Sequence, residues 1–332
     1  MPILQNLVQM TGQRDHLRLE VSVLSTFLQL PAITKVRALE LLKLDAAYWV
    51  RPRTWSQDGQ LVSAAQDFAN DPQRCPLSTI AHLHHCVTAK EHQAQYTLAP
   101  NEHVLWLPVW MHEEVRACLE ITQSKPFSTA GLDVITGIFK VYQNYQSLLD
   151  YSERDALTGL LNRKTFDEHL LRFASATQDH RTEEQPWLAV IDIDHFKSVN
   201  DKFGHLFGDE VLILVANLLR NAFGPQHRIF RFGGEEFVVL MPASSKETAL
   251  ASLEGFRDMV AQHEFPQVGR VTVSVGFAGA KLCSPVEILV QADQALYYAK
   301  ENGRNRVCHF ERLQDQGLLH SSQISHDDVE LF

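Results

Sequence analysis

Residues 231–237 read RFGGEEF, two glycines and two glutamates between the alternating segments RIFRF and EFVVLM. The alternation on both sides predicts two antiparallel strands joined at the glycines. Gly233 and Gly234 would let the backbone approach a ligand closely and would supply any positive φ that the turn needs. A hairpin does not need Glu235 and Glu236 at its tip, so they form either a solvated acidic turn or part of a site.

The segments around this hairpin predict the rest of a domain. In chain order they are strand 187–193, helix 209–223, the hairpin, helix 246–263, strand 271–279 and helix 284–303. Apolar residues every three or four positions indicate the helices, and β-branched runs indicate the strands. The order is that of a split βαβ arrangement. We therefore expect an α/β (α+β) fold with a central βαββαβ sheet flanked by helices.

Two aspartates mark the end of the predicted strand 187–193, which reads WLAVIDI and continues as Asp194. A carboxylate in a strand covered on both faces is costly unless it is paired or binds a metal. If this strand lies beside the hairpin, Asp192 comes close to Glu235, and the two carboxylates require a cation between them. Oxygen ligands without His or Cys favour Mg²⁺. We expect Asp194 to be structural rather than a metal ligand.

Four motifs now point to one family. In chain order they are DALTGLLNR (155–163), DIDHFKSVNDKFGHLFGDEVL (192–212), GGEEF (233–237) and ADQALYYAKENGRNRV (292–307). Residues 155 to about 310 therefore resemble the GGDEF family of diguanylate cyclases. The resemblance implies that two GTP molecules are condensed to cyclic di-GMP with release of two pyrophosphates, in a pair of catalytic domains.

The resemblance also implies roles for individual residues. It makes Asp192, Glu235 and the carbonyl of Ile193 the ligands of Mg²⁺, with Mn²⁺ as the alternative ion. Glu235 would also accept the 3′-hydroxyl proton, with Glu236 and Lys197 as further catalytic groups. The implied substrate-binding positions are Asn200, His205 and Asp209 for guanine, Lys300 and Arg304 for phosphate, and Phe196, Gly233 and Gly234.

For several of these residues, a purely structural or solvent-exposed position is an alternative to the functional role. Lys300 and Arg304 are four residues apart, so they could form a solvated basic face at a helix end. His195 and Phe196 fit packing and backbone positions as well as substrate binding. Asp155 and Arg163 are expected to fix the start of the domain, as an ion pair or a cap.

Residues 1–125 are expected to form a separate α/β domain. We predict helices at 33–44 and 76–90, and strands in AAYWVRPR, HVLWLPVWM and EVRACLEITQ. The pattern resembles a GAF sensor domain, with a PAS-like fold as the alternative, and implies an unidentified small-molecule or other signal. His82, His84 and His85 with Cys86 and His92 suggest a metal or haem, but a half-exposed helix carries such histidines without one.

Residues 126–154 predict a helical, coiled-coil linker between the two domains. Its apolar positions are spaced by three and four residues, as in a seam, at Ile135, Ile138, Tyr142, Tyr145 and Leu149. A homodimer formed through this helix and the N-terminal domain would bring two catalytic domains together. A helix that packs on its own domain would show the same pattern. Residues 312–332 are expected to form a flexible acidic tail.

Composition restricts the class of protein. Of the 332 residues, 30 are Lys or Arg and 40 are Asp or Glu, giving a formal net charge of −10. This balance argues against nucleic-acid or anionic-membrane partners. The five cysteines are scattered without a CxxC pair, and apolar runs are too short for a membrane helix. We therefore expect a reduced, cytoplasmic protein.

Two further expectations come from what the motifs retain and lack. Many relatives bind product through an Arg-x-x-Asp motif whose Asp lies six positions before the first signature glycine. Here that stretch is GPQH (224–227), so we predict weak product inhibition through this site. Every acidic and glycine position of the signature is intact, which favours an active cyclase. A catalytically inactive module that binds GTP or cyclic di-GMP as a receptor is the alternative function, and a cyclase with an adenine-containing product is disfavoured by Asp209.

Overall fold

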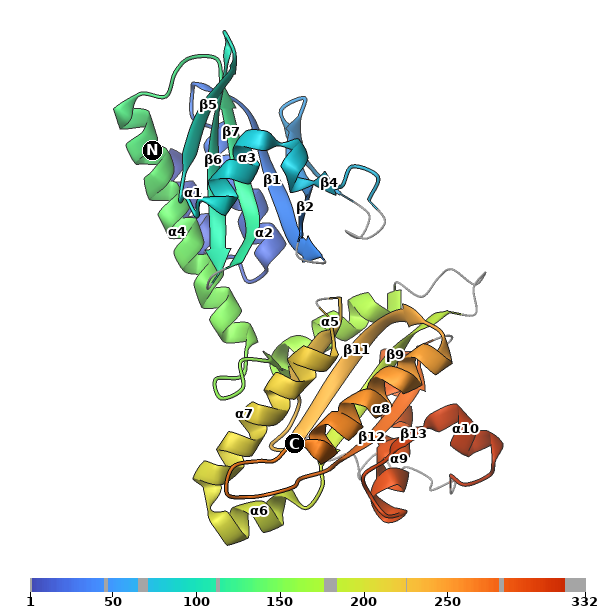
Figure 1. Ribbon diagram of the computed structural model, residues 1–332. Helices are drawn as coiled ribbons and strands as arrows, with labels where there is room; N and C mark the ends of the chain where they lie inside the picture. The colour runs from blue at the N-terminus through green and yellow to red at the C-terminus, as the bar shows by residue number, and fades with distance from the viewer. Residues whose placement is uncertain are drawn as a thin grey trace. The chain divides into compact units, whose positions relative to one another are not determined.

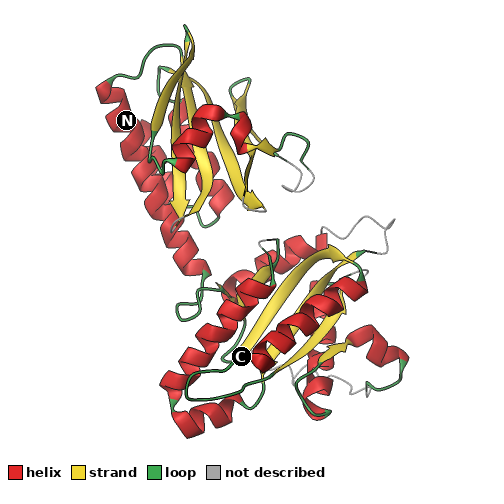
Figure 2. Cartoon of the chain, viewed as in Figure 1, coloured by secondary structure: helices red, strands yellow, loops and turns green. Residues whose placement is uncertain are grey.

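The computed structural model describes residues 2–44, 47–64, 71–111, 114–175, 184–224, 226–280 and 284–319. The chain divides into two compact units, Met1–Ser152 and Glu153–Phe332. Both combine sheets and helices (Figures 1 and 2), so the predicted α/β (α+β) class is confirmed. Among the described helices, none has the length and apolar character needed to cross a membrane.

The N-terminal unit is built on one antiparallel sheet. Its strands run in the order β3-β2-β1-β7-β6-β5, and β4 pairs with β2. In chain order its elements are α1 (Pro2–Thr11), α2 (His16–Leu28), β1 (Ile33–Leu44), β2 (Ala47–Gln57), β3 (Gln60–Ser63), β4 (Cys75–Pro76), the 3₁₀ helix η2 (Leu77–Thr79), α3 (Ala81–Thr88), β5 (Ala94–Ala99), β6 (Glu102–Met111), β7 (Glu114–Gln123) and α4 (Thr129–Glu153).

Helices cover both faces of this sheet, as Figure 1 shows. Val36 and Ala38 of β1 pack with α1, α2 and α4, whereas Leu39 and Leu41 pack with η2 and α3. The prediction of a helix at 33–44 is therefore wrong. A strand covered on both faces needs apolar residues on both sides, which removes the simple alternation and leaves a helix-like spacing of Leu and Val.

Helix α4 uses its predicted seam inside its own unit. Ile135, Ile138, Tyr142 and Leu149 are at most 8% exposed and lie in the core with α1, α2 and the sheet, and Tyr145 packs against them. Contacts inside the N-terminal unit therefore already occupy these apolar side chains. The alternative interpretation of the same spacing, a helix packed on its own domain, is the one that the structure shows.

The C-terminal unit is built on a six-stranded sheet in the order β13-β12-β9-β11-β10-β8. In chain order its elements are β8 (Leu161–Asn162), α5 (Arg163–Ser175), β9 (Gln185–Ile193), α6 (Phe196–Phe203), α7 (His205–Ala222), β10 (Arg228–Arg231), β11 (Glu236–Ser244), α8 (Lys246–Gln262), β12 (Val273–Gly279), α9 (Pro285–Glu301), β13 (Val307–His309) and α10 (Phe310–Asp315).

Strand β9 lies in the middle of this sheet, antiparallel to both β11 and β12. Its odd-numbered residues, such as Ile191, face the core with α7 and α8, and its even-numbered residues, such as Val190, face the core with α5 and α9. Asp192 continues the even-numbered series. The alternation therefore directs the Asp192 side chain toward the α9 face of the sheet.

Close packing fixes α9 over that face. A Cβ on Gly276 of β12 would lie 2.1 Å from the Leu296 nitrogen and 2.2 Å from the Ala292 oxygen, so only glycine allows this approach. At the far end of the unit, the expectation of a loose tail from residue 312 is wrong for its first residues. Helix α10 extends to Asp315, and Leu313 is buried because it completes the apolar core under α9.

Candidate active site

The candidate site begins at the carboxyl end of β9. Asp192 is 4% exposed and lies opposite Glu236 of β11 in the sheet register. Lys300, in the last turn of α9, places its Nζ 2.8 Å from Asp192 Oδ2. The close contact between α9 and β12 thus brings a cation, about 110 residues away in sequence, onto the buried carboxylate.

The signature loop joins β10 to β11 beside this pair. The Phe232 and Gly233 amides donate to the Glu236 carbonyl, and the Ile193 amide donates to the Glu235 carbonyl. A Cβ on Gly233 would lie 2.5 Å from Glu236 Oε2, whereas one on Gly234 would meet nothing within 4 Å. Neither glycine has a positive φ in the left-handed range. The glycines therefore provide space for the Glu236 carboxylate and an open approach, and the turn does not use the positive φ that glycine would allow.

The acidic groups raise one another's pKa. Burial, followed by the nearby Asp192 charge, raises the pKa of Glu235. Burial also raises the pKa of Asp192, with Lys300 opposing the shift and Glu236 and Asp194 adding to it. Removing a proton from either acid is costly here unless positive charge is supplied.

The donor set fits a hard divalent cation. Asp192 and Glu235 offer carboxylate oxygens, and the Ile193 carbonyl is the third oxygen of the predicted set. Burial and neighbouring acids raise the pKa of both carboxylates, so a bound cation would favour their charged forms. Within the described ranges, no group of three or more His, Cys, Asp or Glu side chains is arranged to hold a metal. The predicted set contains only two such side chains, so it would rely on the backbone and on substrate oxygens.

Asp194 has a different role from Asp192. Its carboxylate accepts hydrogen bonds from the Thr272 and Ser274 hydroxyl groups, both at 2.7 Å, and from the Asn305 amide at 3.0 Å. It is 5% exposed. These contacts connect the end of β9 to β12 and to the turn after α9, which is the structural role expected from the sequence.

The predicted guanine positions lie on α6 and α7, which follow β9 directly (Figure 1). Asn200 of α6 is half-buried against Gly208 of α7, while His205 and Asp209 are exposed in the first turns of α7. Among the other predicted positions, Phe196 is 5% exposed in the core, which favours packing. Lys197 is exposed on α6, and Arg304, half-buried, follows α9 with φ 61°.

Two charged residues near the site were missed in the sequence. Asp293 lies on α9 two turns before Lys300 and acts electrostatically with both Lys300 and Asp192. The seven-residue spacing within ADQALYYAK was the available signal, because it places both residues on one face of a helix.

Arg231 is the second of these two charged residues near the site. Its Nη1 lies 3.0 Å from Asp155 Oδ1 and its Nη2 donates to the Gly234 carbonyl at 2.8 Å. Asp155 and Arg163 do not form the expected ion pair, but the alternative, a cap, is present, because Asp155 Oδ1 accepts from the Thr158 amide. Asp155 pairs with Arg231 instead, and Arg163 lies over the Phe232 ring at 4.8 Å. The alternating strand directs Arg231 toward the DALT turn, which a local reading of DALTGLLNR could not show.

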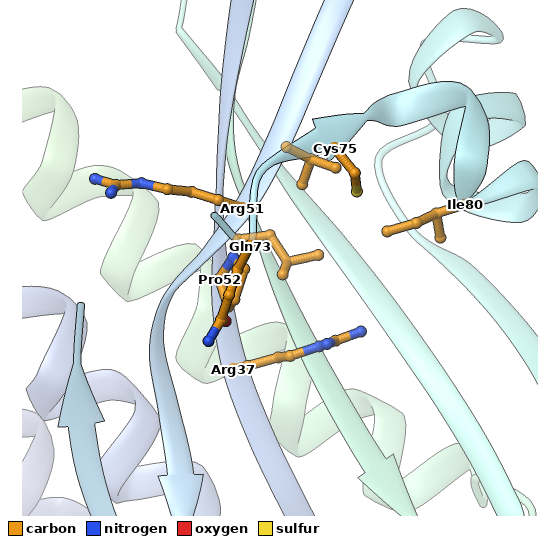
Figure 3. A pocket seen from close by; sticks show the side chains of 8 residues that line it. Arg37, Arg51, Pro52, Gln73, Cys75 and Ile80 are labelled. Atoms are coloured by element: carbon orange, nitrogen blue, oxygen red, sulfur yellow. The ribbon is translucent and has the colours of Figure 1, made fainter. Parts of the chain in front are cut away.

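The N-terminal unit contains a separate small cavity, of about 220 Å³, on the α3 side of its sheet. In Figure 3, Arg37, Cys75 and Ile80 border it, and Arg51 extends to the other side. The Arg37 guanidinium is 42% exposed and pairs with Glu120 at 2.5 and 2.8 Å, and Glu120 also accepts from Trp106 Nε1. An ion pair on a sheet face loses hydration free energy that apolar side chains in the same place would not lose.

The histidine cluster of α3 lies beside this cavity. His82 stacks on Tyr96 with ring centroids 4.2 Å apart, and Tyr96 contacts Trp106. Burial raises the pKa of Cys86 to about 12, which keeps it a thiol. Cys86 is therefore part of the packed layer under α3, whereas His82 is exposed and stacks on Tyr96.

Comparisons with known proteins concern the C-terminal half of the chain. Residues 152–306 match the family model described as diguanylate cyclase, GGDEF domain. Over 157 residues the chain is 44% identical to diguanylate cyclase DgcP of Pseudomonas aeruginosa, which covers 46% of this chain and 23% of that protein. Over 161 residues it is 39% identical to diguanylate cyclase DgcM of Escherichia coli K12, covering 47% and 38%. The chain thus spans less than two fifths of the length of these two relatives.

A solved structure agrees with these matches. The coiled coil and GGDEF domain of DgcB from Caulobacter crescentus, in complex with c-di-GMP, superposes with a TM-score of 0.50 at 32% identity. The match covers 54% of this chain and 96% of that one.

Proposed function

Because residues 152–306 form a GGDEF domain, as the motifs predicted, we propose that this chain is a diguanylate cyclase that condenses two GTP to cyclic di-GMP and two pyrophosphates. The observation that carries the proposal is the convergence of Asp192, Glu235 and Glu236 with Lys300 at an open glycine loop. Phosphoryl transfer needs positive charge around the triphosphate and a base beside the attacking hydroxyl, and this arrangement provides places for both.

The roles follow from position and charge. Asp192, Glu235 and the Ile193 carbonyl would hold Mg²⁺, or Mn²⁺ as the alternative. The ion, when bound, supplies the positive charge that offsets the carboxylates and the phosphate oxygens. Glu235, half-exposed and with a raised pKa, accepts the proton of the 3′-hydroxyl. Glu236 lies beside Gly233 and keeps the loop backbone in position.

Lys300 changes partner in this proposal. In the free protein its ammonium group neutralises Asp192 at 2.8 Å. The side chain is 33% exposed and long, so it can turn to a phosphate oxygen when a divalent cation takes over the carboxylate. Lys197 and Arg304 add cations from α6 and from the turn after α9. Asp209 and Asn200 bind the guanine edge, because a carboxylate accepts from N1–H and the exocyclic amine.

The reaction requires two such domains, each offering a hydroxyl to the other's nucleotide. Since the predicted seam of α4 is buried in its own unit, a different face must pair. Val134, Val141 and Leu148 repeat every seven residues, and Tyr151 follows on the same side. Val134, Leu148 and Tyr151 are 43%, 58% and 74% exposed. We propose that this second stripe forms the homodimer contact.

The N-terminal unit then acts as the regulatory part. We propose that it is a GAF-like sensor whose small cavity beside Arg37 takes the signal molecule. Support comes from the two-sided sheet and the ionic pair at the cavity wall. Helix α4 packs on the same sheet and leads to residue 153, so a change in its packing is a direct route to the catalytic unit.

Incubation of the full chain with GTP and Mg²⁺, followed by mass analysis, tests the activity. We expect cyclic di-GMP and pyrophosphate in a ratio of one to two, and no corresponding product from ATP. If GTP stays intact while cyclic di-GMP binds saturably, the chain is a receptor, which is the alternative function. An adenine-containing product would refute the guanine assignment of Asp209.

A further inference from the structure

A larger cavity, of about 480 Å³, lies in the C-terminal unit away from the candidate active site. Residues of α8, β12, α9, β13 and α10 line it, together with those just before β13 and after α10. Apolar and aromatic side chains make up most of the wall, namely Leu250, Phe277, Tyr298, Val307, Cys308, Leu313 and Leu318. Three cations complete it, and they are Lys246, Arg306 and Arg312, with His309 and Gln316 between them.

Among the described residues, neighbouring acids neutralise these cations only weakly. Within the described ranges, no carboxylate pairs with Arg312, which is exposed on α10, and Arg306 donates through Nε to the Arg304 carbonyl at 3.2 Å. Lys246 is 3.7 Å from Glu247 with both side chains more than half exposed, a contact that contributes little.

The nearby acids are already engaged. Glu254 binds Arg257 at 2.7 Å, and Glu311 accepts from the Gly279 amide and pairs with His309. Both Arg306 and Arg312 lie close enough to the Cys308 thiol to act on it electrostatically. Arg306 and Arg312 thus both line this largely apolar cavity, in a protein whose net charge is −10.

We propose that this cavity binds an organic phosphate with a flat, apolar body. Guanidinium groups match the charge and geometry of a phosphate group better than those of a neutral ligand. The body would pack on the aromatic wall, where His309 already stacks on Phe277 with ring centroids 4.7 Å apart. The volume is in the range of small-molecule sites, roughly 300–1,000 Å³.

Calorimetric titration of the full chain with 1-naphthyl phosphate tests the proposal, because this probe has both features and lacks a guanine. We expect saturable binding with a dissociation constant below about 1 mM, and binding at least about tenfold weaker for inorganic phosphate and for 1-naphthol. The affinity should also fall as salt is added. Absence of saturable binding of 1-naphthyl phosphate overturns the proposal.

Substitutions show which residues bind 1-naphthyl phosphate. Arg312→Ala should weaken it at least about tenfold, Arg312→Lys should retain part of it, and Arg270→Ala, an exposed cation elsewhere in the unit, should change nothing. GTP turnover by Arg312→Ala should equal that of the parent. If Arg304→Ala abolishes binding and Arg312→Ala does not, the probe occupies the candidate active site and the proposal is wrong.

Discussion

At the residue scale, Glu235 carries the strongest catalytic expectation. Replacing it by Gln keeps its size and removes the charge that serves both the metal and the hydroxyl proton. We expect the rate of cyclic di-GMP formation to fall by about 10²–10⁴-fold. The thermal midpoint should not decrease, because Glu235 is half-exposed beside another acid.

A matched control is available on α8. Glu247 is 77% exposed at its side chain and far from the signature in sequence, so Glu247→Gln should leave the initial rate unchanged. A Glu235→Gln variant with nearly the parent's rate would contradict the role assigned to this carboxylate.

Replacing Asp194 should reduce the stability of the fold, whereas replacing Glu235 should reduce the rate. Asp194→Ala leaves the Thr272 and Ser274 hydroxyl groups and the Asn305 amide without their acceptor in a buried place. We expect a cost of about 2 kcal/mol or more. Amide hydrogen exchange in β12 should then accelerate about 30-fold. Asp258→Ala, at an exposed pair on α8, should leave these amides unchanged.

At the element scale, the turn that opens the catalytic unit is fastened to the signature loop by Asp155 and Arg231. Partial burial opposes ionisation of Asp155, but hydrogen bonds from Thr158 and Arg231 hold its pKa below the usual value. A carboxyl group whose folded pKa is lowered stabilises the fold above its unfolded pKa, about 3.9. That stability disappears as the pH falls through the folded value.

Asp155→Asn should therefore be less stable than the parent at pH 7, and the difference should shrink as the pH falls below the unfolded pKa and through the lowered folded pKa. Thermal midpoints measured across this range decide the point. Asp201→Asn, exposed on α6, should follow the parent at every pH. A stability gap that stays constant down to the lowest pH would show that Asp155 acts through something other than its charge.

At the scale of the whole molecule, activity should depend on pairing through the exposed stripe of α4. Leu148→Glu places charges in an apolar two-fold contact, so we expect dimer affinity to fall at least about tenfold. Turnover per molecule should then be low in dilute protein and recover at high concentration. Sedimentation and initial rates over the same concentrations measure both effects.

Leu98→Glu is the matched control, since Leu98 is 51% exposed on β5 compared with 58% for Leu148. It should behave like the parent in both assays. Unchanged assembly and rate in the Leu148→Glu variant would exclude this stripe as the dimer contact.

Product feedback through the stretch before β10 is also expected to be weak. Gly224 and His227 occupy the positions where an Arg and an Asp would bind cyclic di-GMP, and the His227 amide instead closes a turn on the Gly224 carbonyl. Pro225 lies outside the described residues. Low-micromolar cyclic di-GMP should leave the initial rate of the parent nearly unchanged.

The double substitution Gly224→Arg with His227→Asp should install inhibition at those concentrations. A Cβ on Gly224 would meet only the flexible end of Gln226, so the change should be accommodated. Strong non-competitive inhibition of the parent itself would contradict this prediction.

The sequence alone predicted the order of elements in the C-terminal unit and its resemblance to the GGDEF family. The apolar run ending in Asp192 could only be a covered strand, and the alternating segments around Gly233 could only form a hairpin. The capping box at Ser284 and Glu287, with Pro285 at the first turn, set the start of α9 from local signals. These features depend on residues within a few positions of one another, so the chain itself specifies them.

Tertiary structure decided which elements pack against each face of a strand or helix. The segment 33–44 became a strand because β2 and β7 pair with it and helices cover both its sides, which outweighs the helix propensity of its Leu, Glu and Lys residues. The seam of α4 was directed to its own core for the same reason. Lys300 reached Asp192, and Arg231 reached Asp155, only through packing between elements distant in the chain. Periodicity shows that a face is apolar or charged, but the partner of that face is chosen by the free energy of the assembled fold.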